Sequence, residues 1–160
     1  MGIAARKELP GRPHTSSVSW SLFEQLTKAH ELLRQEMQTV DSMTREARPS
    51  DGPFTNARWQ ISQASLRKRA LVAKIVDYLI GQLDHEATLS LKAVRTADQQ
   101  LLRRSASHVR FWSSRAIRQN WEGYCDASRD IRRHMSAQIL LEQQTIPPLL
   151  LQMADREGRA

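Results

Sequence analysis

The sequence of 160 residues contains a single cysteine, Cys125, which excludes an internal disulfide, a zinc ribbon and a CxxC redox motif. No apolar run approaches the roughly 18 to 20 residues that a membrane-spanning helix needs, and the amino terminus lacks the apolar stretch of a secretory signal. Also missing are a glycine-rich phosphate loop, a GxSxG motif and a recognisable cysteine nucleophile. We therefore expect a soluble, cytoplasmic protein that does not enter a membrane and is not a hydrolase or transferase.

Proline and glycine are also scarce where they would interrupt regular structure. No proline occurs between Pro53 and Pro147, and the only glycines in that interval are Gly81 and Gly123. The interval is rich in Ala, Leu, Arg and Gln, which favour helices, and it has no alternating pattern typical of strands. It is too long to form one straight rod in a domain of this size. These features predict an all-α fold in which the chain turns back on itself.

The spacing of apolar residues predicts four amphipathic helices. We expect them at residues 21–43, from 55 or 56 to about 93, from 98 to about 116, and from 120 to just before Pro147. A capping box at Ser21 and Glu24, with Asp98 and Asn120 as caps, supports these starts. Short connections between such helices predict an antiparallel four-helix bundle. The expected divisions are a flexible basic arm at 1–17, the bundle at 18–152 and a flexible tail at 153–160.

Four histidines fall one to each predicted helix, on or beside its apolar stripe. His30 is the clearest case because it lies between Leu26 and Leu33; the others are His85, His108 and His134. Imidazoles that project inward from several helices of a bundle can hold iron or manganese. Each histidine alone is more often a core or boundary residue with satisfied hydrogen bonds than a metal ligand. The arrangement as a set is what favours a metal site.

Several segments resemble hemerythrin-like domains of the HHE type. The segments are residues 26–34 (LTKAHELLR), 78–85 (YLIGQLDH), 107–109 (SHV) and 138–148 (QILLEQQTIPP). In order and spacing the similarity covers residues 20–150. The resemblance implies a hemerythrin-like four-helix bundle that binds non-haem iron or a related cation, with dioxygen or nitric oxide as conceivable small ligands.

The sequence departs from this family in its carboxylates. The family places a histidine and a glutamate four residues apart on the second and fourth helices, and the glutamates bridge two irons. Here Leu89 follows His85, and Gln138 stands where a histidine is expected before Glu142; an alternative alignment uses His134 and puts Gln138 in the glutamate position. The candidate metal ligands are His30, His85, His108, His134 and Glu142. This set indicates a mononuclear or degenerate dinuclear iron site, or a family member that has lost its metal.

A second interpretation rests on the net charge of +7 and three basic clusters, at residues 67–69, 103–104 and 132–133. Such clusters are typical of solvated helix faces, and if they converged they would form a patch for phosphate or for an acidic protein partner. This predicts a metal-free helical module that acts through arginine-rich faces. Nucleic acid is less favoured, because no alternation of aromatic and basic residues surrounds the four tryptophans, which we expect to plug the core.

Overall fold

The structure, a computed structural model, describes residues 17–159, and the predicted basic arm lies outside this range except for Ser17. The described residues form five α-helices and no strand. The helices are α1 (Val18–Met43), α2 (Asp51–Leu79), α3 (His85–Phe111), α4 (Ser114–Gln119) and α5 (Trp121–Gly158). The predicted all-α class is confirmed.

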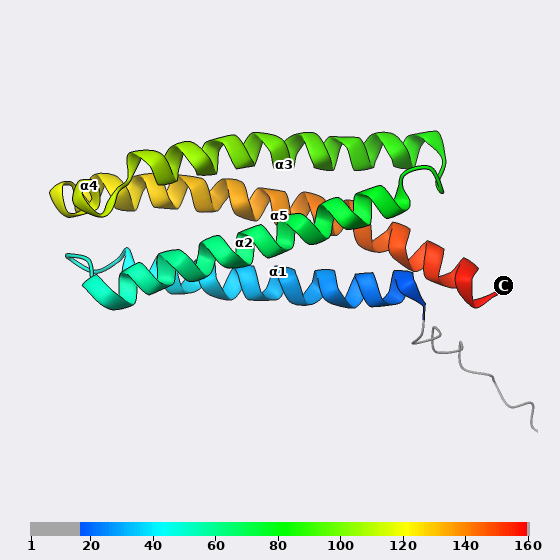
Figure 1. The fold of residues 1–160 in the computed structure, drawn as a ribbon, viewed down its shortest axis with the longest axis horizontal. Coiled ribbons are helices and arrows are strands. Elements are labelled where there is room, and N and C mark those ends of the chain that lie inside the picture. Colours follow the sequence, from blue (N-terminus) through cyan, green and yellow to red (C-terminus); the bar gives the residue numbers. More distant parts are fainter. Residues whose placement is uncertain (1–16, 160) are drawn as a thin grey trace, which may run out of the picture.

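The four long helices run alongside one another, and successive long helices point in opposite directions (Figure 1). α1 packs against both α2 and α5, and α3 packs against α5, whereas α2 and α3 touch much less. The short α4 lies at the end of the molecule where the chain passes from α3 into α5 (Figure 1). Within residues 17–159, no helix combines the length and apolarity needed to cross a membrane.

The connection between α2 and α3 lies about fifteen residues earlier than the sequence had predicted. α2 ends at Leu79, and Gly81 then adopts a φ of 91°, a left-handed conformation that suits glycine just past a helix end. The side chain of Asp84 caps α3 by accepting a hydrogen bond from the backbone of Ala87, at 2.8 Å. The predicted break at 96–98 is wrong, and so is the distribution of one histidine to each helix. His85 opens α3, which also carries His108, and α2 carries none.

The starts of α1 and α5 follow the rules of capping, whereas Ser50 before α2 makes no side-chain cap hydrogen bond. α1 begins at Val18 rather than Ser21, because Ser17 accepts the backbone N–H of Trp20 at 3.0 Å. α2 begins four residues before the predicted start, since a proline such as Pro53 is tolerated in the first turn of a helix. Asn120 caps α5, as predicted.

α5 continues through Pro147 and Pro148, where the sequence had predicted its end. Each proline removes one backbone hydrogen bond and bends a helix, and α5 changes direction in its last third (Figure 1). The buried stripe nevertheless continues across the prolines with Ile146, Leu150 and Met153. Burial of these side chains offsets the cost of the prolines. Residues 153–158 are accordingly helical rather than a flexible tail.

The last turns of α5 contact the first turn of α1. Glu157 accepts hydrogen bonds from the hydroxyl of Ser19, at 2.7 Å, from the backbone N–H of Ser19, at 3.3 Å, and from the hydroxyl of Tyr78. Ser19 is fully buried. Burial alone would raise the pKa of Glu157, but these donors outweigh it and hold the pKa below its ordinary value. One carboxylate thus joins α1, α2 and α5 at this end of the molecule.

We expect Glu157→Ala to lower the free energy of unfolding by about 1 to 2 kcal/mol, because hydrogen bonds to a charged group contribute more than neutral ones. Urea unfolding followed by circular dichroism at 222 nm measures the change. Asp155→Ala is the matched control, since Asp155 pairs with Arg159 on the exposed surface of the same helix end and such pairs contribute little. Equal losses for the two variants would contradict the role given to Glu157.

Candidate functional site

A layer of polar side chains lies buried in the middle of the molecule. It consists of His30 on α1, Lys68 on α2, and Gln138 and Glu142 on α5, which are 2%, 2%, 4% and 0% exposed. The layer separates two apolar clusters along the helices. One cluster includes Leu26, Val72 and Ile146, and the other includes Leu33, Ala64 and Ile139. Charged side chains are seldom buried to this extent unless they are paired. The layer is therefore the first place to look for function.

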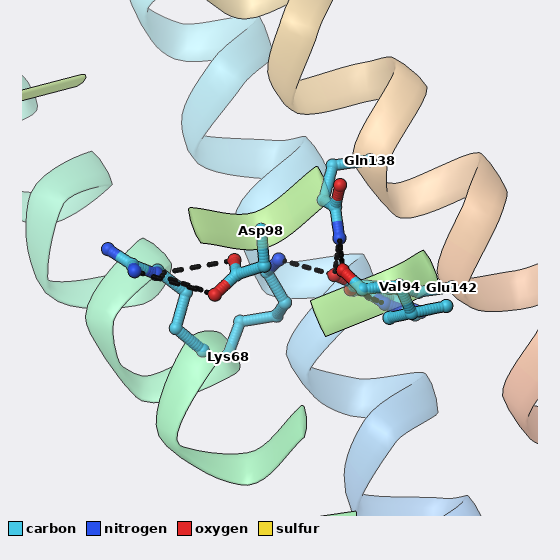
Figure 2. A network of polar contacts seen from close by, with 7 residues as sticks. Lys68, Val94, Asp98, Gln138 and Glu142 are labelled. Atoms are coloured by element: carbon cyan, nitrogen blue, oxygen red, sulfur yellow. Dashed lines mark hydrogen bonds and ion pairs between the residues drawn. The ribbon is translucent and has the colours of Figure 1, made fainter. Parts of the chain in front are cut away.

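Glu142 is the centre of the layer, and three donors surround its carboxylate. The Nε2 of His30 lies 2.9 Å from Oε1, and the Nζ of Lys68 lies 2.8 Å from Oε2. The side-chain amide of Gln138 donates to the same Oε2 at 2.9 Å (Figure 2). All the interactions are close to ideal hydrogen-bond lengths. The buried ion pair of Lys68 and Glu142 is thus completed by two further partners of the carboxylate, His30 and Gln138.

Gln138 extends the layer to α3. Its amide also donates to the backbone carbonyl of Val94 at 3.3 Å, so both N–H groups of the amide point to acceptors (Figure 2). Among the described residues, this backbone oxygen is the one atom of α3 that bonds to the layer. The layer consequently links all four long helices at one level.

The surroundings of Glu142 act on its pKa in opposite directions. Burial by itself would raise the pKa of this carboxyl group. The hydrogen bond from His30, the positive charge and hydrogen bond of Lys68 and the hydrogen bond of Gln138 outweigh burial, so the pKa lies below its ordinary value of 4.5. Glu142 is therefore ionised at neutral pH.

Because of this lowered pKa, the free energy of unfolding depends on pH. A carboxyl group whose pKa is lower in the folded state contributes stability that is fully present above the unfolded value and is lost as the pH falls through the folded value. Asp41 and Glu157 also have lowered pKa values and act in the same direction. We expect the protein to lose stability as the pH falls below about 4.5.

The contribution of Glu142 can be isolated with the variant Lys68→Met/Glu142→Gln, which lacks the buried charges. Urea unfolding at several pH values between about 5 and 3 should show the smaller loss of stability in this variant. Parallel loss in the two proteins would mean that Glu142 does not carry the effect.

Lys68 is the residue that sequence reasoning missed. It belongs to the basic cluster at 67–69, which is typical of a solvated helix face. Its position held the signal. Ala64, Lys68, Val72, Val76 and Leu79 follow steps of four and three and form the buried stripe of α2. A lysine within such a stripe requires a buried anion, and Glu142 was the acidic residue on the matching stripe of α5. Val72, the next residue of this stripe after Lys68, is apolar, so the charge at Lys68 interrupts an otherwise apolar stripe.

The predicted metal ligands are only partly brought together. His30 and Glu142 are in contact, as described. His85 is exposed at the first turn of α3. His108 is half-buried with its ring 5.7 Å from that of Tyr124, and burial together with the charge of Arg58 lowers its pKa.

His134 does not contact the polar layer. It is half-buried on α5 and lies 3.8 Å from Asp130 on the same helix. Gln138, not His134, is therefore the residue that faces the polar layer together with Glu142. Within residues 17–159, no three His, Cys, Asp or Glu side chains gather as they would around a metal ion.

The donors in the layer do not fit a non-haem iron site as they are arranged. Iron sites in helical bundles use several carboxylates and imidazoles, whereas the layer offers one imidazole and one carboxylate. The ammonium group of Lys68 holds the carboxylate oxygen that a cation would need.

Two of the three basic clusters, at 67–69 and 132–133, place side chains inside, whereas Arg103 and Arg104 are exposed. Arg69 pairs with Asp98 at 3.3 Å. Arg132, 7% exposed, donates to Asp41 at 2.8 Å and to Thr44 at 3.1 Å, so that it joins α5 to the end of α1. The hydrogen bond from Arg132 is the main reason that the pKa of Asp41 is lowered.

The surface has a second feature, a cleft of about 640 Å³ between α2 and α3 with α5 as its floor. Trp59 and Leu66 line it from α2, and Leu102 and Val109 line it from α3. These four side chains are 57%, 55%, 43% and 58% exposed. The expectation that all tryptophans plug the core is thus wrong for Trp59.

The cleft exists because small side chains face one another where the two helices would otherwise touch. Ser62 and Ser65 on α2 and Ser105 and Ala106 on α3 all line the cleft. Side chains of this size cannot fill the space between two helices. This explains why α2 and α3 make few contacts while their neighbours pack closely.

Comparison of the chain with protein-family models, with curated proteins and with solved structures gives no match. The polar layer and the cleft are therefore the observations on which a function can be based.

Proposed function

We propose that the chain is a hemerythrin-like antiparallel four-helix bundle whose centre is held by an internal ion pair, and that it works as a protein-interaction module. The observation that carries the first half is the contact between Lys68 and Glu142, 2.8 Å apart and almost fully buried. The ammonium group supplies the positive charge that a metal ion would supply to the carboxylate. The bundle then needs no cation to hold its centre together.

The arrangement of the long helices supports the bundle. α1 packs on α2 and α5, α3 packs on α5, and successive long helices are antiparallel (Figure 1). The hemerythrin resemblance adds that the layer of His30, Gln138 and Glu142 lies on the stripes where the family carries its ligands. Lys68 faces Glu142 from the second helix, α2, whereas His85, which the resemblance matches to the second-helix histidine, opens α3.

The cleft supports the interaction role. Large apolar side chains that remain exposed on both sides of a groove are typical of surfaces that bind other molecules. The layer is satisfied internally and offers no open position for a substrate, so the cleft is the better candidate for the working surface. This favours binding over catalysis.

Photo-crosslinking tests the interaction role. p-Benzoylphenylalanine at position 59, in the cells that naturally make the protein, should form adducts with a partner protein on irradiation. The same amino acid at position 140 is the control, because Leu140 is 54% exposed but does not line the cleft. Equal or absent crosslinking at position 59 would contradict the proposal.

Elemental analysis tests the metal-free centre. Protein purified without an affinity tag and incubated with ferrous iron should contain far less than one metal per chain. Stoichiometric iron that is lost on replacing His30 with Ala would contradict the proposal and restore the iron site.

A further inference from the structure

The charged residues that line the cleft all carry the same sign. They are Arg58 and Arg69 on α2, Arg110 on α3 and Arg132 on α5, with His108 beside them. No aspartate or glutamate of the described residues lines the cleft. An apolar groove with a purely basic rim is complementary to a partner that is apolar on one side and acidic at its edges.

Among the described residues, two of these arginines form ion pairs and two do not. Arg69 pairs with Asp98, and Arg132 pairs with Asp41. Among the described residues, no carboxylate forms an ion pair with Arg58 or Arg110. Their positive charges therefore remain available to an incoming acidic group.

Arg58 is also held in place. It donates to the backbone carbonyl of Trp112 at 2.8 Å, and its guanidinium lies 5.7 Å from the centre of the Tyr124 ring. A side chain that is already ordered loses little conformational freedom when a partner binds. Arg58 is thus a fixed positive charge at one end of the cleft.

The shape of the cleft fits a helix. The lining residues of α2 run from Arg58 to Arg69, a length of about 16 Å at the helical rise of 1.5 Å per residue. Trp59 and Leu66 are seven residues apart on one wall, and Leu102 and Val109 are seven apart on the other. A helix of about three turns has this length and the same repeat of apolar positions.

Two other occupants fit less well. A small apolar ligand inside the groove would leave the exposed parts of Trp59 and Val109 at its edges uncovered, whereas a helix lying over the groove covers both edges. A second copy of the chain would bring together two surfaces of a protein with a net charge of +7. Like charges at an interface oppose association.

We propose that the cleft between α2 and α3 binds one amphipathic helix of a partner protein, with its apolar face on Trp59, Leu66, Leu102 and Val109 and its acidic residues beside Arg58 and Arg110. This inference rests on the proposed interaction role and adds the chemistry of the partner. Binding of this kind uses the helix-in-groove mode, in which apolar side chains at i, i+3, i+4 and i+7 supply the anchors.

Fluorescence anisotropy with two labelled synthetic peptides of eighteen residues tests the proposal. Both peptides carry leucines at helical spacing; one has glutamates at the flanking positions and the other has lysines. We expect the glutamate peptide to bind at least about tenfold more tightly, and its affinity to fall with added salt because the cleft charges are partly exposed. Equal binding of the two peptides would overturn the inference.

Leu66→Glu and Leu140→Glu form a matched pair, since the two leucines are 55% and 54% exposed and only Leu66 lines the cleft. We expect Leu66→Glu to weaken the glutamate peptide by about tenfold or more and Leu140→Glu to leave it unchanged. Circular dichroism confirms that both variants are folded. Equal weakening by both substitutions would overturn the inference.

The inference and the proposed function fail in different ways. A partner that crosslinks to position 59 through a basic or non-helical segment overturns the acidic helix and leaves the interaction role intact. Sedimentation of the protein alone as a dimer that Leu66→Glu dissociates would make a second copy the occupant. Absence of any specific adduct at position 59 removes the interaction role itself.

Discussion

Replacing Glu142 with glutamine should lower the free energy of unfolding by about 3 to 5 kcal/mol, a large part of the 5 to 15 kcal/mol typical of a domain. The substitution keeps the shape of the side chain and removes only its charge. Lys68, 2% exposed, would then be a buried cation without an anion. Removing one partner of a buried ion pair costs much more than the pair contributes, because the remaining charge is not solvated.

A second substitution should reverse most of this loss. In the background of Glu142→Gln, Lys68→Met removes the unpaired charge and keeps a long, apolar side chain in the same space. The new glutamine can still accept the hydrogen bond from His30. We expect the double variant to lie within about 1 to 2 kcal/mol of the original protein, because uncharged replacements of buried ion pairs are often nearly neutral.

Urea unfolding of the two single variants and the double variant gives the coupling between the two sites. Asp126→Asn is a suitable control, since Asp126 forms an exposed pair with Arg129 and should cost at most about 1 kcal/mol. If Glu142→Gln costs no more than this control, the ion pair does not hold the centre of the molecule together.

The paired substitutions Lys68→His and Gln138→His should create a metal site in the same layer. The nitrogen atoms at both positions lie 2.8 to 2.9 Å from the carboxylate of Glu142, as does the Nε2 of His30. Neighbouring ligands of a tetrahedral zinc ion with bonds of 2.0 Å are about 3.3 Å apart. We expect three imidazoles and one carboxylate to gather around one zinc ion in this layer, with the competing ammonium group gone.

Thermal unfolding with and without zinc measures the effect, because a ligand that binds only the folded state stabilises it by about 2.7 kcal/mol at a hundredfold excess over its dissociation constant. We expect a rise in melting temperature for the double variant and none for the original protein. Adding His30→Ala should abolish the rise. A double variant that behaves as the original protein would argue against the hemerythrin-like arrangement of these positions.

The sequence predicted the helices better than their ends. Apolar residues at helical spacing were enough to identify an all-α fold, because each long helix buries one stripe. The end of α2 was missed because apolar residues continue at helical spacing beyond Gly81, although a glycine followed by Asp84 is a recognised stop and start signal. At Pro147 the error was the reverse, since tertiary packing of Ile146 and Leu150 outweighs the local preference of proline.

Only part of the polar layer was predicted from the sequence. His30 and Glu142 were identified through the resemblance and through their place on apolar stripes, and they are in contact. Lys68 was not, because a single sequence does not show which of three consecutive basic residues turns inward until the helix phase is known. The cleft could not be predicted either, since it arises from small residues on two helices that the sequence does not place opposite each other.

The buried ion pair also has a consequence for how α5 finds its place along α1 and α2. If α5 slipped by one turn, Lys68 would face Gln138 or Ile146, and Glu142 would enter an apolar cluster. Only one register pairs both charges, so we expect the layer to select that register against others that bury equal apolar surface. In the variant Lys68→Met/Glu142→Gln this selection is absent, and spin-label distances between α1 and α5 should broaden; unchanged distances would show that apolar packing alone fixes the register.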